Sequence, residues 1–333
     1  MSAIEVVIEP GRTVDWDVFK AESAQHDVGS MALDGYVSGA PAFDRIVNHE
    51  GRILSVKNFN HHEDVERLAT LATCAQVDLA IKSGLTDAFR DIRGNFAAKV
   101  FVNDSDQDVC AAVWLLRHKE LVLHTGNPMV TRFVTVAGIM DMTAGSYPFD
   151  GDSQMLRELN WINDPYNRAR LTGEATSSDP EVHRSIIDSV GERISKHIAG
   201  RGDSKDLDMR FDPLDKGNGW TMIREVGPQG KLGAINEGAK ALIQIRDQDP
   251  DHIHVSFWRQ SEYVPLDFPK IMERLREREL EKRIELGLVP KETRELSANW
   301  GGGTTTFGSP RIIGTVLDTD EIGAIADEFS IAY

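Results

Sequence analysis

The sequence AAKVFVNDSDQDVCAAVWLL spans residues 97–116 and contains the pattern that decides the fold class. Residues 97–102 form a short apolar run, which is typical of a buried strand. Residues 109–116 have the small and apolar composition of a buried helix, and the acidic segment 103–108 separates the two. A buried strand, an acidic turn and a buried helix in succession are typical of an α/β unit.

Segments on either side of this stretch continue the alternation. Residues 4–8 are compatible with a first strand, and residues 65–82 place apolar side chains at helical spacing before Gly84. Residues 120–124 and 134–140 are predicted as further strands. Strands that alternate with helices favour a parallel sheet. We therefore predict an α/β fold, with a mainly parallel sheet in the N-terminal domain and a smaller α/β C-terminal domain.

The chain of 333 residues is longer than one average domain. We expect a metal-binding domain at 1–150, a helical connector at 151–205 and a substrate-binding domain at 206–333. The connector has a helical pattern, and residues 200–219 after it lack periodicity and are rich in Asp, Gly and Lys. The C-terminal segments predicted as strands are 220–224, 241–246, 253–258 and 311–317, with a charged helix at 268–286.

Composition excludes several classes of protein. The net charge of −16 disfavours a binder of long nucleic acid, because that affinity depends on basic side chains that neutralise phosphates. No segment approaches the roughly 18 consecutive apolar residues of a membrane span, and the N-terminus has no basic residue of the kind that begins a signal peptide. The two cysteines, Cys74 and Cys110, are too few for a disulfide framework. A cytoplasmic location is expected.

Acidic and histidine side chains follow several of the predicted strands. Divalent cations bind carboxylates and imidazoles that converge from different loops, and the carboxyl edge of a sheet provides such convergence. Clusters of this kind activate water and stabilise displacement at phosphorus. The sequence therefore predicts a site for one or two divalent metal ions. The candidate ligands are Asp34, His61, His62, Asp104, Asp106, Asp108 and Asp141.

Each of these residues also has a structural explanation. Asp106 or Asp108 could cap the helix that follows, since aspartate is a favoured N-cap residue. One of the adjacent histidines could form a hydrogen bond in the interior, because neighbouring residues of an extended chain point to opposite faces. Asp34 and Asp141 are of a residue type that is common in turns. All the acids could be caps and surface groups.

Short motifs in the chain resemble those of the DHH family of phosphoesterases. The sequence NFNHH at 58–62 is similar to the Asp-His-His motif, and ATLATCAQ at 69–76 looks like the helix that follows it. SDQDVCAA at 105–112 resembles the Asp-x-Asp motif, and DMTAGSY at 141–147 resembles the late Asp-Thr-Gly-x-Phe element. Asp34 corresponds to the single aspartate before the double histidine. The motif order is rearranged, since Asp-x-Asp comes first in the family, and Asn60 stands where the family has Asp.

The C-terminal half resembles the companion substrate-binding domain of that family, DHHA1, in which a strand ending in Ser and Arg precedes a glycine-rich loop. Consecutive glycines allow backbone N–H groups to approach an anion closely, and an arginine adds a charge-assisted hydrogen bond. A triple glycine is also common in flexible turns. The predicted substrate-binding residues are Arg259, Gly301, Gly302, Gly303 and Arg311.

The resemblance implies a metal-dependent hydrolase of phosphoester or phosphoanhydride bonds in a small phosphorylated substrate, such as a short oligonucleotide, a nucleotide or pyrophosphate. It also implies manganese as the cofactor and His61 and His62 as catalytic residues. Two other functions stay open. Asn60 could mark a non-catalytic nucleotide-binding or partner-binding relative, and carboxylate and imidazole clusters also serve hydrolases of non-phosphate substrates. The charged helix 268–286 could contact a second copy of the chain or form a solvated face.

Overall fold

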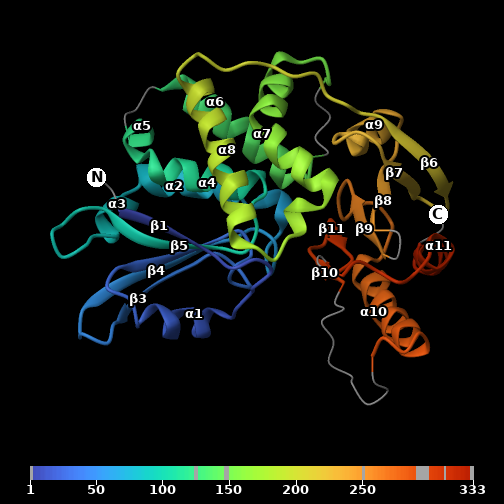
Figure 1. The fold of residues 1–333 in the computed structure, drawn as a ribbon, viewed down its shortest axis with the longest axis horizontal. Coiled ribbons are helices and arrows are strands. Elements are labelled where there is room, and N and C mark those ends of the chain that lie inside the picture. The colour runs from blue at the N-terminus through green and yellow to red at the C-terminus, as the bar shows by residue number, and fades with distance from the viewer. Residues whose placement is uncertain are drawn as a thin grey trace. The chain divides into compact units, whose positions relative to one another are not determined.

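The computed structural model describes residues 3–123, 127–145, 150–249, 252–289, 300–310 and 313–330 (Figure 1). Within these ranges the chain has a mixed α/β fold with two separate sheets, which confirms the predicted class. The strands are β1 (Ala3–Ile8), β2 (Gly29–Leu33), β3 (Ala42–Val47), β4 (Ile53–Phe59), β5 (Ala97–Val102), β6 (Phe211–Lys216), β7 (Thr221–Glu225), β8 (Ala241–Asp249), β9 (His252–Arg259), β10 (Gly301–Gly302) and β11 (Thr306–Gly308). The α-helices are α1 (Trp16–Ser23), α2 (Thr73–Lys82), α3 (Leu85–Ala88), α4 (Gln107–Arg117), α5 (Lys119–Leu123), α6 (Pro128–Met142), α7 (Gln154–Thr172), α8 (Pro180–Ile198), α9 (Gly230–Asn236), α10 (Phe268–Glu285) and α11 (Thr319–Glu328).

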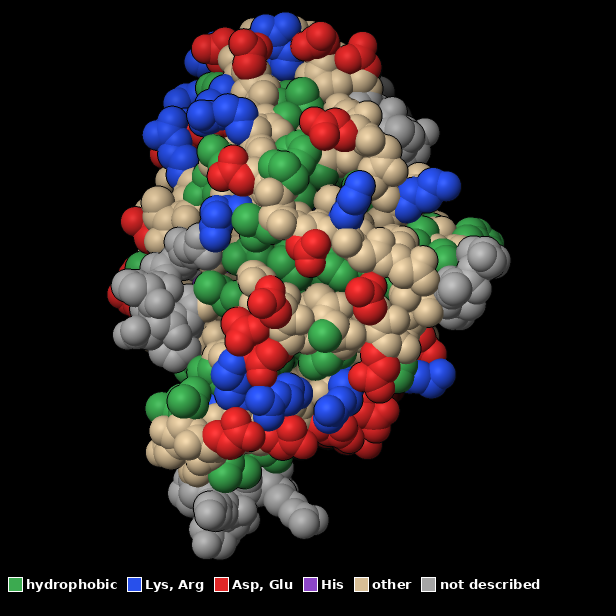
Figure 2. Space-filling model, turned by 90° about the vertical axis from the view of Figure 1, so that its right-hand side faces the viewer, with side chains coloured by type: hydrophobic (Ala, Val, Ile, Leu, Met, Phe, Trp, Pro, Cys, Tyr) green, Lys and Arg blue, Asp and Glu red, His purple; other side chains and the backbone are tan. Residues whose placement is uncertain are grey.

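The surface carries charges of both signs. On the face that Figure 2 shows, acidic and basic side chains lie beside one another, and no extended basic patch is visible. Among the helices in the described ranges, none combines the length and the apolar character that crossing a membrane requires.

The chain forms two compact units. The first comprises Met1–Met142, Phe149–Arg170 and Glu174–Asp206, and the second comprises Thr143–Pro148, Leu171–Gly173 and Leu207–Tyr333.

The sheet of the first unit has the strand order β1-β5-β2-β4-β3. Parallel pairs join β1 to β5, β5 to β2 and β2 to β4, whereas β3 is antiparallel to β4. Because β5, β2 and β4 are parallel neighbours, their carboxyl ends lie at the same edge of the sheet. The loops that leave this edge begin at Asp34, Asn60 and Asn103.

Helices cover both faces of this sheet. Helix α1 lies on one face, where Phe19 packs with Val56 and Phe101. Helices α2, α4, α6 and α8 lie on the other face (Figure 1). The small side chains of α4 are buried, as the sequence predicts, and Trp114 on α4 donates a hydrogen bond to Ser195 Oγ on α8 at 2.8 Å. This bond fixes α4 against α8.

Two segments predicted as strands are helical. Residues 119–123 form α5, with His124 outside the described residues, and residues 128–142 form α6. The valines of 134–140 favoured a strand, because β-branched residues are enriched there. However, the buried Val130, Phe133 and Val134 recur at helical spacing, and Pro128 at the first helical position is favourable for a helix. The prediction for 134–140 was therefore wrong.

Three other predicted boundaries change. The helix predicted at 65–82 begins at Thr73 and follows a short 3₁₀ turn, Arg67–Ala69 (η1). The segment 200–219, predicted as a loop, contains strand β6. In the segment 311–317, residues 311–312 lie outside the described ranges, and Thr315 forms an isolated bridge with Ile253.

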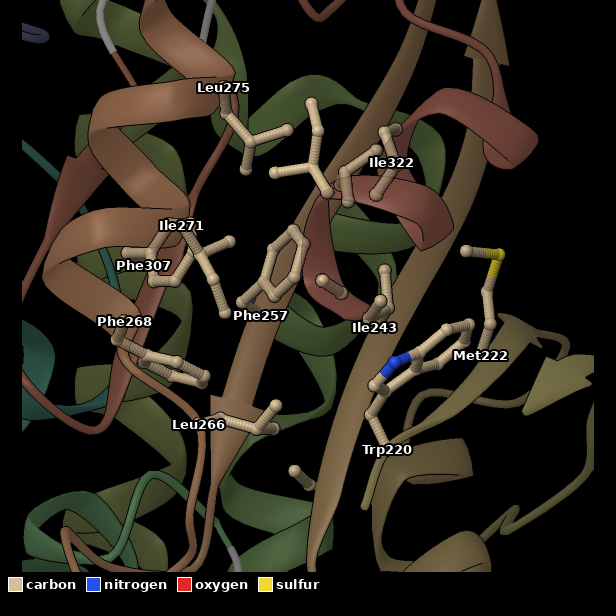
Figure 3. Close-up of a cluster of buried hydrophobic side chains, with 14 of the residues drawn as sticks. Trp220, Met222, Ile243, Phe257, Leu266, Phe268, Ile271, Leu275, Phe307 and Ile322 are labelled. Atoms are coloured by element: carbon tan, nitrogen blue, oxygen red, sulfur yellow. The ribbon is translucent and has the colours of Figure 1, made fainter. Parts of the chain in front are cut away.

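The sheet of the second unit has the order β10-β11-β9-β8-β7-β6, in which β7 and β8 are parallel and the other pairs are antiparallel. One face packs against α10 and α11 through a large apolar cluster that includes Phe257, Ile271 and Ile322 (Figure 3). A smaller cluster, with Leu242, Trp258 and Ala234 of α9, covers the other face. This unit therefore has its own core.

Candidate metal centre

Asp34 follows strand β2 directly and lies at the carboxyl edge of the first sheet. Its φ of 50° places it in the left-handed region, which aspartate tolerates better than most residues. The side chain is 2% exposed. Its Oδ1 accepts hydrogen bonds from Thr73 Oγ1 at 3.0 Å and contacts His62 Nε2 at 2.9 Å. The chain thus buries a carboxylate among hydrogen-bonding groups.

His61 lies two residues after strand β4 and is completely buried. Its Nε2 is 2.7 Å from Asp141 Oδ2, 3.4 Å from Asp34 Oδ1 and 3.7 Å from Asp108 Oδ2. These carboxylates come from the end of β2, the first turn of α4 and the last turn of α6. His61 is therefore the centre of the cluster, and the convergence predicted from the sequence occurs for these residues.

Asp108 has a structural role as well as a place in the cluster. Its Oδ2 accepts the backbone N–H of Thr73 at 2.6 Å and its Oδ1 that of Cys74 at 2.8 Å. Both N–H groups belong to the first turn of α2, so Asp108 on α4 satisfies the N-terminus of a neighbouring helix. The alternative that Asp108 caps its own helix α4 is wrong.

Asp106 is the residue that caps α4. Its extended backbone and the hydrogen bond from Val109 N–H to Oδ1 at 2.9 Å are those of an N-cap. Asp104 accepts the backbone N–H of Ser105 at 2.6 Å. Neither residue belongs to the groups whose ligand atoms converge within 4.8 Å in the described part of the chain. A role for them as metal ligands stays a prediction.

Asp141 joins the cluster from a helix rather than from a strand. It lies in the last turn of α6, and its side chain is 20% exposed. The sequence analysis predicted that Asp141 follows a strand and lies near the other candidate ligands. The side chain does lie near them, but the segment before it is the helix α6. The helix brings it to the sheet edge because α6 packs beside α2 and α4.

The charges of the cluster shift one another's pKa values. Burial would raise the pKa of Asp34, but His62 and His61 hold it well below its usual range. Burial would lower the pKa of His61, but Asp141 and Asp34 raise it to about 10. Burial, with Asp141 and Asp34, raises the pKa of Asp108 to about 7, and burial with the charge of Asp34 raises that of Asp106 well above its usual range. The site thus concentrates negative charge in a buried place.

These residues fit a divalent cation. His61 Nε2 lies 2.7 Å from Asp141 Oδ2, whereas the buried Nδ1 of His61 has no hydrogen-bond partner among the described residues. Buried polar groups are rarely left in this state, and a bound ion is one of the ways in which they are satisfied. Oxygen and imidazole donors suit the divalent ions that protein sites bind. The converging groups are Asp34, His61 and His62, and His61, Asp108 and Asp141, and these buried clusters could hold a metal ion.

A third group of possible ligands lies on the surface. Asp27, His49 and Glu50 converge within the same limit, but all three are exposed. Exposed acidic groups are common without a metal, so this group gives no comparable indication.

Two residues that contact the cluster were not predicted as site residues from the sequence. Arg67 is 5% exposed, and its Nη1 lies 2.7 Å from His62 Nδ1. Thr73 donates to Asp34 from the first turn of α2. A buried arginine five positions after a histidine pair has no periodic signal, although a charged residue inside an otherwise apolar segment is a sign of a buried polar contact.

The predicted substrate-binding residues lie in the second unit. Arg259 is 7% exposed and donates from Nε to Thr304 O at 2.8 Å and from Nη1 to Leu266 O at 2.7 Å. Gly302 has a φ of 145°, and a Cβ there would lie 2.5 Å from Phe307 Cα, so the turn between β10 and β11 requires glycine. Arg311 lies outside the described residues. Substrate binding by Arg259, Gly301, Gly302 and Gly303 stays a prediction, and Arg259 and Gly302 have structural explanations.

No protein-family model matches the chain, and no curated protein matches its sequence.

Proposed function

We propose that this chain is a metal-dependent hydrolase of phosphoester or phosphoanhydride bonds in a small phosphorylated substrate. The observation that carries the proposal is the environment of His61, whose Nε2 faces the carboxylates of Asp141, Asp34 and Asp108 and whose buried Nδ1 lacks a hydrogen-bond partner among the described residues. The location agrees with it, because the carboxyl edge of an α/β sheet is where such folds bind ligands. The resemblance to the DHH family supports phosphorus as the reacting centre and manganese as the cofactor.

Asp34, His61, Asp108 and Asp141 are the residues that would hold the metal. A divalent cation at this position would neutralise charge on a phosphoryl group and make water a better nucleophile at neutral pH. The carboxylates supply the negative charge that a second cation would also need, so one or two ions fit the proposal. In the same proposal, residues 1–150 form a mainly parallel metal-binding domain and residues 206–333 bind the substrate.

We assign different roles in the reaction to the individual residues around the site. His62 is 28% exposed, whereas His61 is completely buried. His62 is therefore the histidine that can reach a substrate, and we assign it a hydrogen bond to the leaving oxygen, which stabilises the negative charge that develops there as the bond from phosphorus breaks. Thr73 orients Asp34 through its hydroxyl, and Asp108 is held by the N-terminus of α2.

The first test is elemental analysis of protein purified without chelator, followed by manganese-dependent phosphate release from nucleotides, short oligonucleotides and pyrophosphate. We expect bound metal and turnover of at least one of these substrates. Bound metal without turnover would favour a non-phosphate substrate or a non-catalytic binder. Absence of metal binding after manganese is added back would refute the proposal.

The variant that isolates the site is Asp141→Asn, because the Oδ2 atom of Asp141 caps no helix and contacts His61 and Arg67, both of which belong to the site. We expect loss of metal affinity and of turnover, and in chelator a weaker dependence of stability on pH, because the His61 pKa loses the contribution of Asp141. Asp27→Asn is the matched control, since it makes the same change in the exposed group. Equal effects of the two substitutions would count against the site.

The role of Asp106 in the site should be tested with Asp106→Asn rather than with Asp106→Ala. Asp106→Ala would remove the N-cap of α4, which costs about 1 kcal/mol, and would confound activity with stability. Asp106→Asn keeps an oxygen that can accept from Val109 N–H and removes the charge. Loss of turnover in this variant with an unchanged unfolding midpoint would make Asp106 part of the site.

A further inference from the structure

Arg67 is buried beside His62, and each of its three guanidinium nitrogens forms a hydrogen bond. It begins the turn η1, five residues after His62, and is 5% exposed. Nη1 lies 2.7 Å from His62 Nδ1, Nη2 donates to Asp141 O at 3.0 Å, and Nε donates to Met142 O at 3.3 Å. One guanidinium therefore joins the histidine to the end of helix α6.

The chemistry of the guanidinium decides which nitrogen of His62 carries hydrogen. Arginine has N–H donors and no acceptor. His62 Nδ1 must therefore accept the hydrogen bond from Arg67, which leaves the ring hydrogen on Nε2. That nitrogen lies 2.9 Å from Asp34 Oδ1, and a carboxylate oxygen accepts. Both contacts of His62 thus agree on a single tautomer.

This tautomer separates the roles of the two histidines. A ring nitrogen that carries hydrogen has no lone pair for a metal, whereas Nε2 of His61 faces the carboxylates of Asp141, Asp34 and Asp108, the other candidate ligands. We infer that Arg67 is a positioning residue that holds His62 as an Nε2–H donor facing Asp34 and so keeps it out of the metal coordination. His61 is then the imidazole ligand, and His62 is a hydrogen-bond donor. The role of Arg67 in turnover rests on the proposed function. The tautomer of His62 is inferred from its hydrogen bonds and is independent of that function.

The same guanidinium also positions Asp141. The carbonyl groups of the last turn of a helix lack partners within the helix, and a cation there is favourable for the helix dipole. Arg67 satisfies two of these carbonyls on α6, at Asp141 and Met142. This fixes the helix end that carries Asp141 beside His61. Lysine cannot reproduce the arrangement, because its ammonium group lacks the planar set of donors.

The tautomer can be measured without any substrate. In chelated protein with ¹⁵N-labelled histidine, two-bond correlations between ring protons and ring nitrogens distinguish an Nε2–H ring from an Nδ1–H ring. The His62 signals are assigned by their loss in His62→Gln. We expect the Nε2–H form in the wild-type chain, and an Nδ1–H form there would overturn the inference even if no Arg67 variant folds.

Variants of Arg67 test whether this residue sets the tautomer of His62. In Arg67→Met and Arg67→Lys we expect His62 to populate both tautomers, whereas Arg45→Met, at an exposed arginine on β3, should leave its signals unchanged. Unchanged His62 signals in Arg67→Met would show that the arginine does not set the tautomer.

Kinetics then separate positioning from a merely structural role. With manganese at saturation, we expect Arg67→Met to retain bound metal, to lower kcat by about 10²-fold, the lower end of the range for loss of one hydrogen-bond donor to the transition state, and to leave KM within a factor of about two. Arg67→Lys should recover little of this loss. A fall in metal content that accounts for the lost activity, or an unchanged kcat, would contradict the role in turnover. Absence of turnover in the wild-type chain would instead refute the proposed function and leave the tautomer to the spectra.

Discussion

Asn60 donates a hydrogen bond from its side-chain Nδ2 to the carbonyl oxygen of Gly39 at 2.8 Å. The same nitrogen donates to Val37 O at 3.2 Å, and Oδ1 accepts the backbone N–H groups of His61 at 2.8 Å and His62 at 3.1 Å. The amide therefore holds the turn that presents the two histidines. Aspartate has no hydrogen to donate, so the asparagine is required by its contacts and gives no sign of lost chemistry.

Asn60→Asp should destabilise the first unit by about 3 kcal/mol, because a buried carboxylate would face two carbonyl oxygens. The measurement is urea unfolding in chelator, with the exposed Asn236→Asp as the control. If Asn60→Asp keeps the wild-type midpoint and binds an additional metal ion, position 60 is a ligand position after all.

The sequence indicates the α/β class through patterns that are local. The strand at 97–102 and the helix at 109–116 have unambiguous composition, and both occur, as β5 and α4. The strand at 134–140 was predicted wrongly because a short run of valines has the same composition in a buried strand and on one buried helix face. The packing of α6 on α2 and α4 decides between them, and a local pattern contains no information about that packing.

Some residues of the candidate site could likewise be predicted from local patterns, whereas others depend on contacts between distant parts of the chain. Asp34, His61 and Asp108 follow strands whose parallel pairing brings them together, so the sheet-edge argument finds them. Arg67 and Thr73 contribute through contacts between residues far apart in the chain, such as Thr73 with Asp34. For the cap of α4 the sequence left Asp106 and Asp108 as alternatives, because both precede the apolar helix, and the structure shows that the cap is Asp106.

The stability of the chelated protein should fall as pH rises from 7 to 9. Asp141 and Asp34 outweigh burial and raise the pKa of His61 to about 10 from its ordinary 6.5. Between these values the folded chain holds a proton that the unfolded chain has lost, so the contribution is complete below pH 6.5 and disappears as pH rises through 10. The upper limit of the effect is about 1.4 kcal/mol per pH unit for one proton.

Metal should remove most of this dependence, because the ligands must lose their protons to bind. Urea unfolding at each pH, with chelator and with manganese, measures both slopes. Asp108, whose pKa is raised to about 7, adds a loss of the same sign between its ordinary value of 3.8 and 7. Parallel slopes in the two conditions would mean that the metal binds elsewhere.

His183 should stabilise the loop between β5 and α4. Its Nε2 donates to Ser177 O at 2.8 Å and its Nδ1 accepts from Ser105 Oγ at 2.9 Å, and Ser105 lies between Asp104 and Asp106. His183→Leu leaves the buried hydroxyl of Ser105 and the partly buried carbonyl of Ser177 without this partner, and we expect a cost of about 2 kcal/mol. His183→Gln, which can donate and accept, should recover part of it. Urea unfolding measures the loss, and a wild-type midpoint in His183→Leu would exclude the role.

Arg259 allows a direct test between a structural role and substrate binding. Its guanidinium donates to the carbonyl oxygens of Thr304 and Leu266 and lies 4.7 Å from the ring centre of Phe268, in the core shown in Figure 3. Removing it leaves the carbonyls of the buried residues Leu266 and Val264 without this donor and takes a cation from an aromatic face.

We expect Arg259→Met to destabilise the second unit by about 3 kcal/mol, with metal affinity unchanged because the metal ligands belong to the first unit. Arg274→Met, on the surface of α10, is the matched control and should stay within about 0.5 kcal/mol of wild type. Urea unfolding and manganese titration provide the two measurements. An increase of KM in Arg259→Met with an unchanged unfolding midpoint would favour the substrate clamp instead, because a residue that contacts substrate without supporting the fold alters binding alone.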